Sequence, residues 1–100
     1  MQLEPLTDVA GKKRMIDRLF EHWQLDEAQR DALSELRESE PDLLLEIHAR
    51  LRVLIPHDRD IVYSWIHLKN KIFDHKTPLE IIYDGHLNVV LAYLREASCR

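Results

Sequence analysis

Residues 42–55 read DLLLEIHARLRVLI, and this stretch decides the fold because its apolar residues recur with the period of an α-helix. The apolar stripe consists of Leu44, Ile47, Leu51 and Leu54, widened by Leu43. Pro41 suits the first turn of such a helix, whereas Pro56 ends it, because proline lacks the backbone N–H that a helix interior needs. The stretch therefore predicts a helix with one buried face.

The residues before this stretch predict two more helices. Thr7 or Asp8 can cap the first helix with a side-chain oxygen. Its expected apolar face is Met15, Ile16, Leu19, Phe20 and Trp23. Asp26 is the expected cap of the second helix, DEAQRDALSELRE, where acidic residues in the first turn complement the helix dipole. Its expected apolar line is Ala28, Ala32 and Leu36.

After Pro56 the pattern predicts another helix and then a loop. Asp58 or Asp60 caps this helix, and its apolar residues are Ile61, Val62, Trp65 and Ile66. Residues 68–76, LKNKIFDHK, lack a clear period, so we expect a loop that Ile72 and Phe73 pin to the core.

The strongest local signal is Thr77-Pro78-Leu79-Glu80. Thr at the N-cap, Pro at the first helical position and Glu two positions later predict a capping box. Gly85 is expected to end this short helix in a left-handed conformation. A last helix, from about residue 87 to 97, should place Val90, Leu91 and Leu94 inward.

The composition agrees with this helical pattern. The chain has 100 residues, of which 45% are hydrophobic and 32% charged, and its two Gly and four Pro are too few for a β-sandwich. We predict an all-α fold, a compact bundle of five or six short helices in a single domain. Residues 1–42 form its helical N-terminal region, and residues 43–100 form the second region.

Several function classes find no support in the sequence. No apolar run approaches the roughly 18 residues of a membrane span, and the acidic start is unlike a secretory signal, so we expect a cytoplasmic protein. The six histidines show no H-x-x-x-H spacing, and Cys99 is the one cysteine. Gly-rich phosphate loops and a G-x-S-x-G elbow are missing. We therefore expect no catalysis, no metal and no cofactor.

The net charge of −4 is uneven along the chain. Residues 1–50 hold seven Lys/Arg against twelve Asp/Glu, a balance that disfavours binding to a nucleic-acid backbone. The run Lys12-Lys13-Arg14 is the exception, either as a DNA contact or as a solvated helix face.

The aromatic residues divide between core and surface. Trp23 and Trp65 lie on apolar helix faces and are expected in the core, whereas Tyr83 and Tyr93 suit a core or an interface equally. A core this small is marginal in a monomer, so we also expect a homo-oligomer, most simply a dimer.

An ordered series of motifs runs from Leu44 to the end of the last helix. It comprises LLEIHARLRVLI (44–55), YSWI (63–66), Asn70 with Phe73, TPLE (77–80), and Gly85 with NVVLAYLREA (88–97). In order and spacing this series resembles the C-terminal toxin-binding domain of the Xre/MbcA/ParS antitoxin family.

The resemblance implies a type II antitoxin whose partner is a RES-domain toxin, an enzyme that consumes NAD. Such an antitoxin blocks its toxin by direct contact that covers the NAD pocket. The residues that the resemblance places in the contact are Asn70, Phe73, Thr77, Pro78, Glu80, Asp84, Gly85, Tyr93 and Arg95. Arg100, with its terminal carboxylate, is assigned to a pocket for an anionic ligand.

The sequence departs from the family pattern in three places. Lys69 stands where the family has a proline before Asn70. Asp74-His75 stand where it has a Gly-Gly pair. If those glycines allow a positive φ, we expect the loop in this chain to take another shape. The stretch LFEHWQLDEAQRDAL resembles the opening of the family's helix-turn-helix domain. Only residues 37–42 then remain before Leu43, too few for a recognition helix, so DNA binding is doubtful.

Two alternatives to the antitoxin hypothesis stay open. One is a DNA-binding regulator of the same ancestry, which would use the cations at residues 12–14. The other is an interaction domain that has lost its toxin partner, for which the altered Asp74-His75 pair is the only indication.

Overall fold

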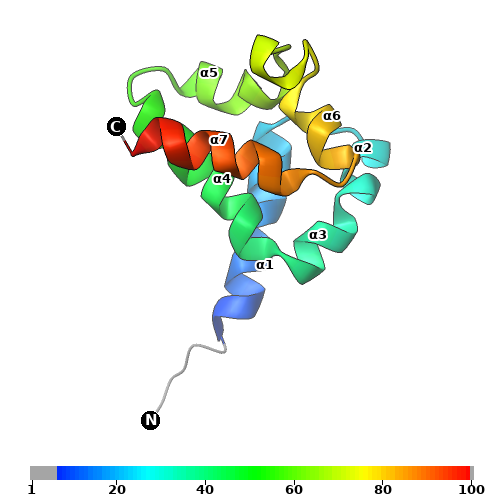
Figure 1. The fold of residues 1–100 in the computed structure, drawn as a ribbon. Coiled ribbons are helices and arrows are strands. Elements are labelled where there is room, and N and C mark those ends of the chain that lie inside the picture. Colours follow the sequence, from blue (N-terminus) through cyan, green and yellow to red (C-terminus); the bar gives the residue numbers. More distant parts are fainter. Residues whose placement is uncertain (1–6, 100) are drawn as a thin grey trace. The chain divides into compact units, whose positions relative to one another are not determined.

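The computed structural model describes residues 7–99, with side chains from residue 10 onward, and all of its regular elements are helices (Figure 1). In chain order they are α1 (Thr7–His22), α2 (Glu27–Ala32), α3 (Ser34–Ser39), α4 (Pro41–Leu54), α5 (Arg59–Ser64), the 3₁₀-helices η1 (Trp65–His67) and η2 (Lys71–Phe73), α6 (Pro78–Tyr83) and α7 (Leu87–Ser98). The predicted all-α class is confirmed. Within this range the helices also lack the length and apolar character that a membrane span requires.

The helix count corrects the prediction of five or six, because the expected helix from Asp26 is divided in two. Leu33 interrupts it with φ −99° and ψ 2°, and its side chain is completely buried. Of the expected apolar line, Ala28 and Ala32 are exposed and Leu36 is half-buried. Leucine buries more apolar area than alanine, so the turn that brings Leu33 inward is favoured over a continuous helix.

The chain divides into two compact units, residues 1–45 and 46–100, whereas the sequence suggested a division after residue 42. In the first unit α1 buries Ile16, Leu19 and Phe20, and Trp23 follows in the turn after the helix. Met15 was expected to join this face but is 56% exposed. The caps expected at Thr7 or Asp8 involve side chains outside the described part.

Polar contacts also join the elements of the first unit. Asp26 caps α2, as predicted, and it also forms a capping box with Gln29. Arg37 on α3 donates two hydrogen bonds to the Asp17 carboxylate on α1, at 2.7 and 2.9 Å. This planar two-point contact fixes α3 against α1 in one orientation.

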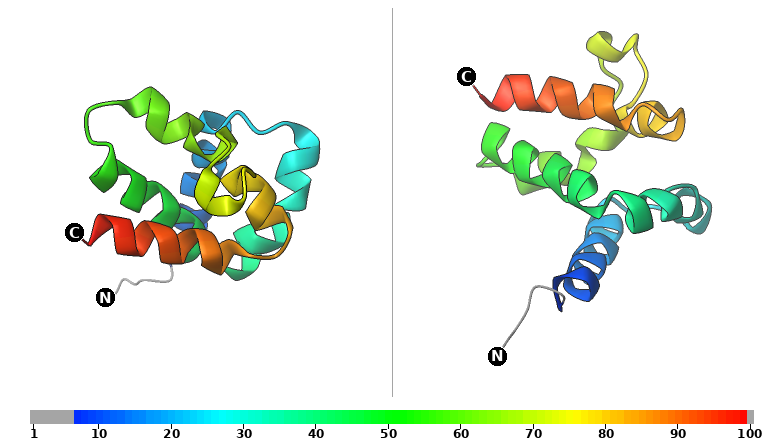
Figure 2. Two further views of the ribbon diagram at one scale, coloured as in Figure 1. Left: turned by 45° about the horizontal axis from the view of Figure 1, so that its top comes forward. Right: turned by 60° about the horizontal axis from the view of Figure 1, so that its bottom comes forward.

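The second unit is built on α4, where the predicted stripe is buried at Ile47 and Leu51 and half-buried at Leu54. Figure 2 shows α7 alongside this part of α4, and the Glu46–Arg95 ion pair joins the two helices. Asp58, not Asp60, caps α5, since its carboxylate accepts a hydrogen bond from the Ile61 N–H at 3.1 Å. The remaining core of this unit is Val62, Ile66, Phe73, Pro78, Leu79, Ile82, Leu87, Val90, Leu91 and Leu94.

Candidate functional site

The residues that the resemblance singles out begin with a closed loop, residues 70–76. Asn70 and Lys76 form an isolated antiparallel bridge, with the Asn70 N–H donating to the Lys76 carbonyl at 3.1 Å. The Asn70 carbonyl accepts from the N–H groups of Phe73 and His75, both at 2.9 Å, and its side-chain oxygen accepts from Ile72 N–H at 3.0 Å. Asn70 therefore organises the 70–76 loop from its first position.

Two residues in this loop adopt the left-handed conformation without being glycine. Asp74 has φ 61° and His75 has φ 65°. We expected Asp74 and His75 to change the shape of the loop if glycine were needed there for positive φ. Both residues nevertheless take the positive φ that glycine would allow, so the backbone angles do not show that change. Asp and His enter this region more often than most residues, and the hydrogen bonds around Asn70 hold them there.

An aromatic cluster of Trp65, Phe73 and Tyr93 holds the loop against α7. The Trp65 and Tyr93 rings are parallel within 4°, with centroids 6.3 Å apart. Phe73 meets both rings edge-on, 6.3 Å from Trp65 and 5.6 Å from Tyr93. Phe73 is buried, whereas Trp65 and Tyr93 are half-buried. Phe73 is therefore an anchor beneath the surface, and Tyr93 is the member on α7 that solvent reaches.

The start of α6 confirms the predicted capping box. Thr77 N–H donates to Glu80 Oε1 at 2.8 Å, and Glu80 N–H donates to Thr77 Oγ1 at 3.1 Å. The hydrogen bond from the Thr77 backbone lowers the pKa of Glu80, with smaller contributions from the Lys69 and Lys76 charges. Pro78 is buried, so its role is to preset the first turn rather than to offer a contact surface.

The end of α6 is a Schellman motif centred on Gly85. His86 N–H donates to the Ile81 carbonyl and Gly85 N–H to the Ile82 carbonyl, both at 3.0 Å. Gly85 has φ +87°, as the predicted left-handed cap requires. Asp84 lies in the turn, 3.8 Å from the Lys76 amine, so a weak ion pair links the turn to the 70–76 loop.

Arg95 has an intramolecular partner that the sequence did not reveal. Its guanidinium donates to both oxygens of Glu46 on α4, at 2.7 Å each. Arg50 also donates to Glu46, at 3.1 Å, and reaches Ser98 Oγ at 3.1 Å. These hydrogen bonds, the one from Arg95 foremost, lower the pKa of Glu46 from 4.5 to about 2, and the pKa of Arg95 is raised in turn.

The prediction that Ile72 would be buried was wrong. Ile72 was expected to pin the loop to the core, but its side chain is 59% exposed. It lines an open cavity of about 340 Å³ together with Tyr93, Glu96 and Ala97. The conformation of the 70–76 loop explains this outcome, because Phe73 takes the buried position and its neighbour then points outward. The Ile72 cavity is the part of the site that periodicity could not identify.

The cations proposed for DNA contact are partly neutralised within the first unit. Lys12 lies 3.0 Å from Asp42 and Lys13 lies 2.6 Å from Glu38. Arg14 is exposed and has no ion pair with the side chains that the structure describes, those of residues 10–99. Two of the three charges are thus shared with carboxylates, which favours the solvated-face interpretation. Arg100 lies outside the described residues.

Other chemistry is sparse in the described residues. They include no group of three or more His, Cys, Asp or Glu side chains able to hold a metal ion, and the thiol of Cys99 is free and exposed at the end of α7. Comparison with known proteins finds no matching family model, no similar curated protein and no similar solved structure.

Proposed function

We propose that this chain is the antitoxin of a type II toxin–antitoxin pair and that it neutralises an NAD-consuming RES-domain toxin by covering its active site. The proposal rests on the ordered motif series from residue 44 to 97. The observation that carries it furthest is the exposed Ile72 side chain, held on a closed loop beside Tyr93 and the Ile72 cavity. Tyrosine is among the residue types enriched at the energetic centre of protein interfaces, and Ile72 beside Tyr93 would add apolar area that a partner could bury.

The rigidity of the surrounding segment supports tight binding. Its loop is closed by hydrogen bonds around Asn70, its helix is fixed at both ends, and Phe73 anchors it to the core. A surface ordered before binding loses little conformational entropy when the partner docks. Such a segment can therefore fill an enzyme's substrate pocket without first folding.

The proposal also assigns different roles to the residues of the predicted contact. Ile72 and Tyr93 would touch the toxin, whereas Phe73 and Pro78, both buried, would support that surface from within. Arg95 would act through Glu46, by fixing α7 to α4, rather than by reaching the toxin.

The test is co-expression of the full chain with the RES-domain protein encoded beside it, followed by size-exclusion chromatography and an assay of NAD consumption. We expect a stable complex in which NAD loss is suppressed. Ile72→Lys should weaken inhibition about tenfold or more, as is common for a central contact residue. Val53→Lys is the matched control, because Val53 is also an exposed aliphatic residue of the second unit, 64% exposed on α4.

Two results would contradict the proposal at different levels. Unchanged NAD consumption at saturating antitoxin would reject the antitoxin function itself. Full inhibition by Ile72→Lys, or an equal loss with Val53→Lys, would keep the antitoxin function but reject the Ile72 cavity as its contact surface.

A further inference from the structure

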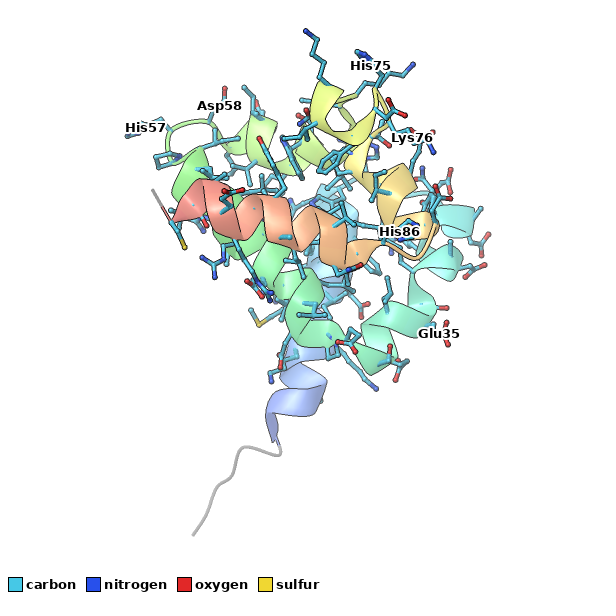
Figure 3. The ribbon with its side chains drawn as sticks, in the orientation of Figure 1. Glu35, His57, Asp58, His75, Lys76 and His86 are labelled. Atoms are coloured by element: carbon cyan, nitrogen blue, oxygen red, sulfur yellow. The ribbon has the colours of Figure 1, made fainter. Side chains whose placement is uncertain are left out.

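A second cavity lies in the second unit, between the end of α4 and α5. Its volume is about 320 Å³, and its lining residues are His48, Arg52, Ile55, Pro56, Arg59, Val62 and Tyr63. Figure 3 labels His57 and Asp58 on the loop that joins these two helices. None of the lining residues belongs to the aromatic cluster or to the Ile72 cavity. We call it the arginine cavity, and it is separate from the contact surface proposed above.

The charged side chains that line the arginine cavity are basic. Arg52 and Arg59 both line it, and the lining residues that the structure describes include no carboxylate. Arg50 and Arg95 of the same unit are already paired with Glu46. By contrast, neither Arg52 nor Arg59 has an ion pair or a side-chain hydrogen bond among residues 10–99, whose side chains the structure describes. Like charges around one cavity repel each other, and a bound anion would remove that repulsion.

Two acidic residues, Asp58 and Asp60, neighbour Arg59 in the chain, but neither lines the cavity. The Asp58 carboxylate accepts the capping hydrogen bond from Ile61 N–H. Asp60 is exposed on the first turn of α5 and is absent from the lining. The two guanidinium groups are thus the principal charges at the cavity, and guanidinium is the group best suited to bind phosphate through paired N–H donors.

The remaining walls are apolar or aromatic. Ile55, Pro56 and Val62 supply aliphatic surface, and the His48 ring stacks on Tyr63 with centroids 5.3 Å apart and planes within 6°. This stack fixes the shape of one wall. A cavity of this size falls at the small end of the range for organic ligands, which extends from roughly 300 Å³ upward.

We propose that the arginine cavity binds a small phosphate ester, with Arg52 and Arg59 holding the phosphate and the aliphatic wall covering its organic group. Two guanidinium groups match the two negative charges that a phosphate monoester carries near neutral pH. This site is independent of toxin binding, because it shares no residue with the proposed contact surface.

The test is an NMR titration of the full chain at pH 7.5 and constant ionic strength. The probes are inorganic phosphate, phenyl phosphate and benzoate, with sodium chloride as the ionic-strength control. We expect saturable shifts at the Arg52 and Arg59 side-chain N–H groups and at the α5 amides. Phenyl phosphate should bind most tightly, because inorganic phosphate lacks the organic group and benzoate carries one charge fewer.

Variants connect the shifts to the two arginines. Arg52→Gln/Arg59→Gln should weaken phenyl phosphate binding by about tenfold or more, because each substitution removes a charge-assisted hydrogen bond. Arg14→Gln/Arg18→Gln is the matched control, since it removes the same charge from exposed arginines of α1. The two-dimensional spectrum of each variant verifies that it is folded.

If sodium chloride alone produced the same NMR shifts, the proposal of a specific anion site would be wrong. It would also be wrong if the α1 variant lost as much phenyl phosphate binding as Arg52→Gln/Arg59→Gln. Tighter binding of benzoate than of phenyl phosphate would overturn the assignment to phosphate. Tighter binding of inorganic phosphate than of its phenyl ester would overturn the role of the aliphatic wall.

Discussion

The Glu46 carboxylate gives the sharpest quantitative test of the second unit. Its pKa is lowered from 4.5 to about 2 by hydrogen bonds from Arg95 and Arg50. A shift of this size sets an upper limit of about 3 kcal/mol on the stability that the ionised carboxylate adds. The Glu46 side chain is 22% exposed, so solvent screens the interaction, and we expect about 1–2 kcal/mol in practice.

Glu46→Gln should therefore lower the free energy of unfolding of the second unit by about 1–2 kcal/mol at pH 7. The pKa is depressed in the folded state, so the contribution is fully present above pH 4.5 and is lost as the pH falls toward 2. The difference between wild type and Glu46→Gln should accordingly shrink across this window. Urea unfolding followed by NMR signals of α4 and α7, from pH 7 to pH 2.5, measures it.

Two controls separate the ion pair from general effects. Glu21→Gln makes the same change at an exposed carboxylate of α1 and should leave the free energy of unfolding of the second unit unchanged. In an Arg95→Gln background, the pH-dependent part of the Glu46→Gln effect should fall, because the largest cause of the pKa shift is gone. A Glu46→Gln effect that stays constant from pH 7 to pH 2.5 would refute the reasoning, because it could not arise from the ionised carboxylate.

Three further changes test the segment around the proposed contact surface by urea unfolding. Thr77→Ala should cost about 1 kcal/mol through loss of the cap on α6, and Thr77→Ser should restore most of it; no difference between the two would argue against the cap. Gly85→Ala should cost about 1 kcal/mol because φ is +87°, where an L side chain is strained. No atom lies within 4 Å of the added Cβ, so a clearly larger loss would indicate a clash and contradict this account. His75→Gly should gain about 0.5 kcal/mol by removing left-handed strain, whereas the same change at His57, where φ is negative, should destabilise; a loss at both would contradict this account.

Local signals in the sequence predicted the helix boundaries that side-chain or glycine caps define, although they missed the break at Leu33. Asp26 with Gln29, Thr77 with Glu80, and the cap at Gly85 all act within four or five residues, so short-range chemistry determines them. Pro41 likewise began α4 where expected. Helix ends are governed by backbone groups that need partners nearby, and the sequence contains both sides of each such contact.

Burial was predicted less well, because it depends on what a residue packs against. Periodicity placed Met15 on the apolar face of its helix, and Ile72 was expected to pin its loop to the core, yet both side chains are exposed. Leu33 lay off the expected line but is completely buried and breaks the helix there. Periodicity identifies the apolar face of an element, and the neighbouring elements then select which members of that face are covered.

The candidate site shows the same limit for polar residues. The pair of Glu46 and Arg50, four residues apart on one helix, was readable from the sequence. Their partner Arg95 is 49 residues beyond Glu46, and no local pattern indicates that pairing. The family resemblance assigned Arg95 to the contact with a partner protein, whereas in the structure its guanidinium holds both oxygens of an internal carboxylate.

The 70–76 loop suggests why its Asp74-His75 pair is compatible with the motif series. The left-handed backbone at these two residues coincides with hydrogen bonds that converge on Asn70 from Ile72, Phe73 and His75. Such a network outweighs the modest cost of positive φ for Asp and His, so glycine is not required for this backbone. The residue on which the loop depends is then Asn70. A departure from the family pattern at residues 74 and 75 therefore carries less weight against the antitoxin hypothesis than a change at Asn70 would.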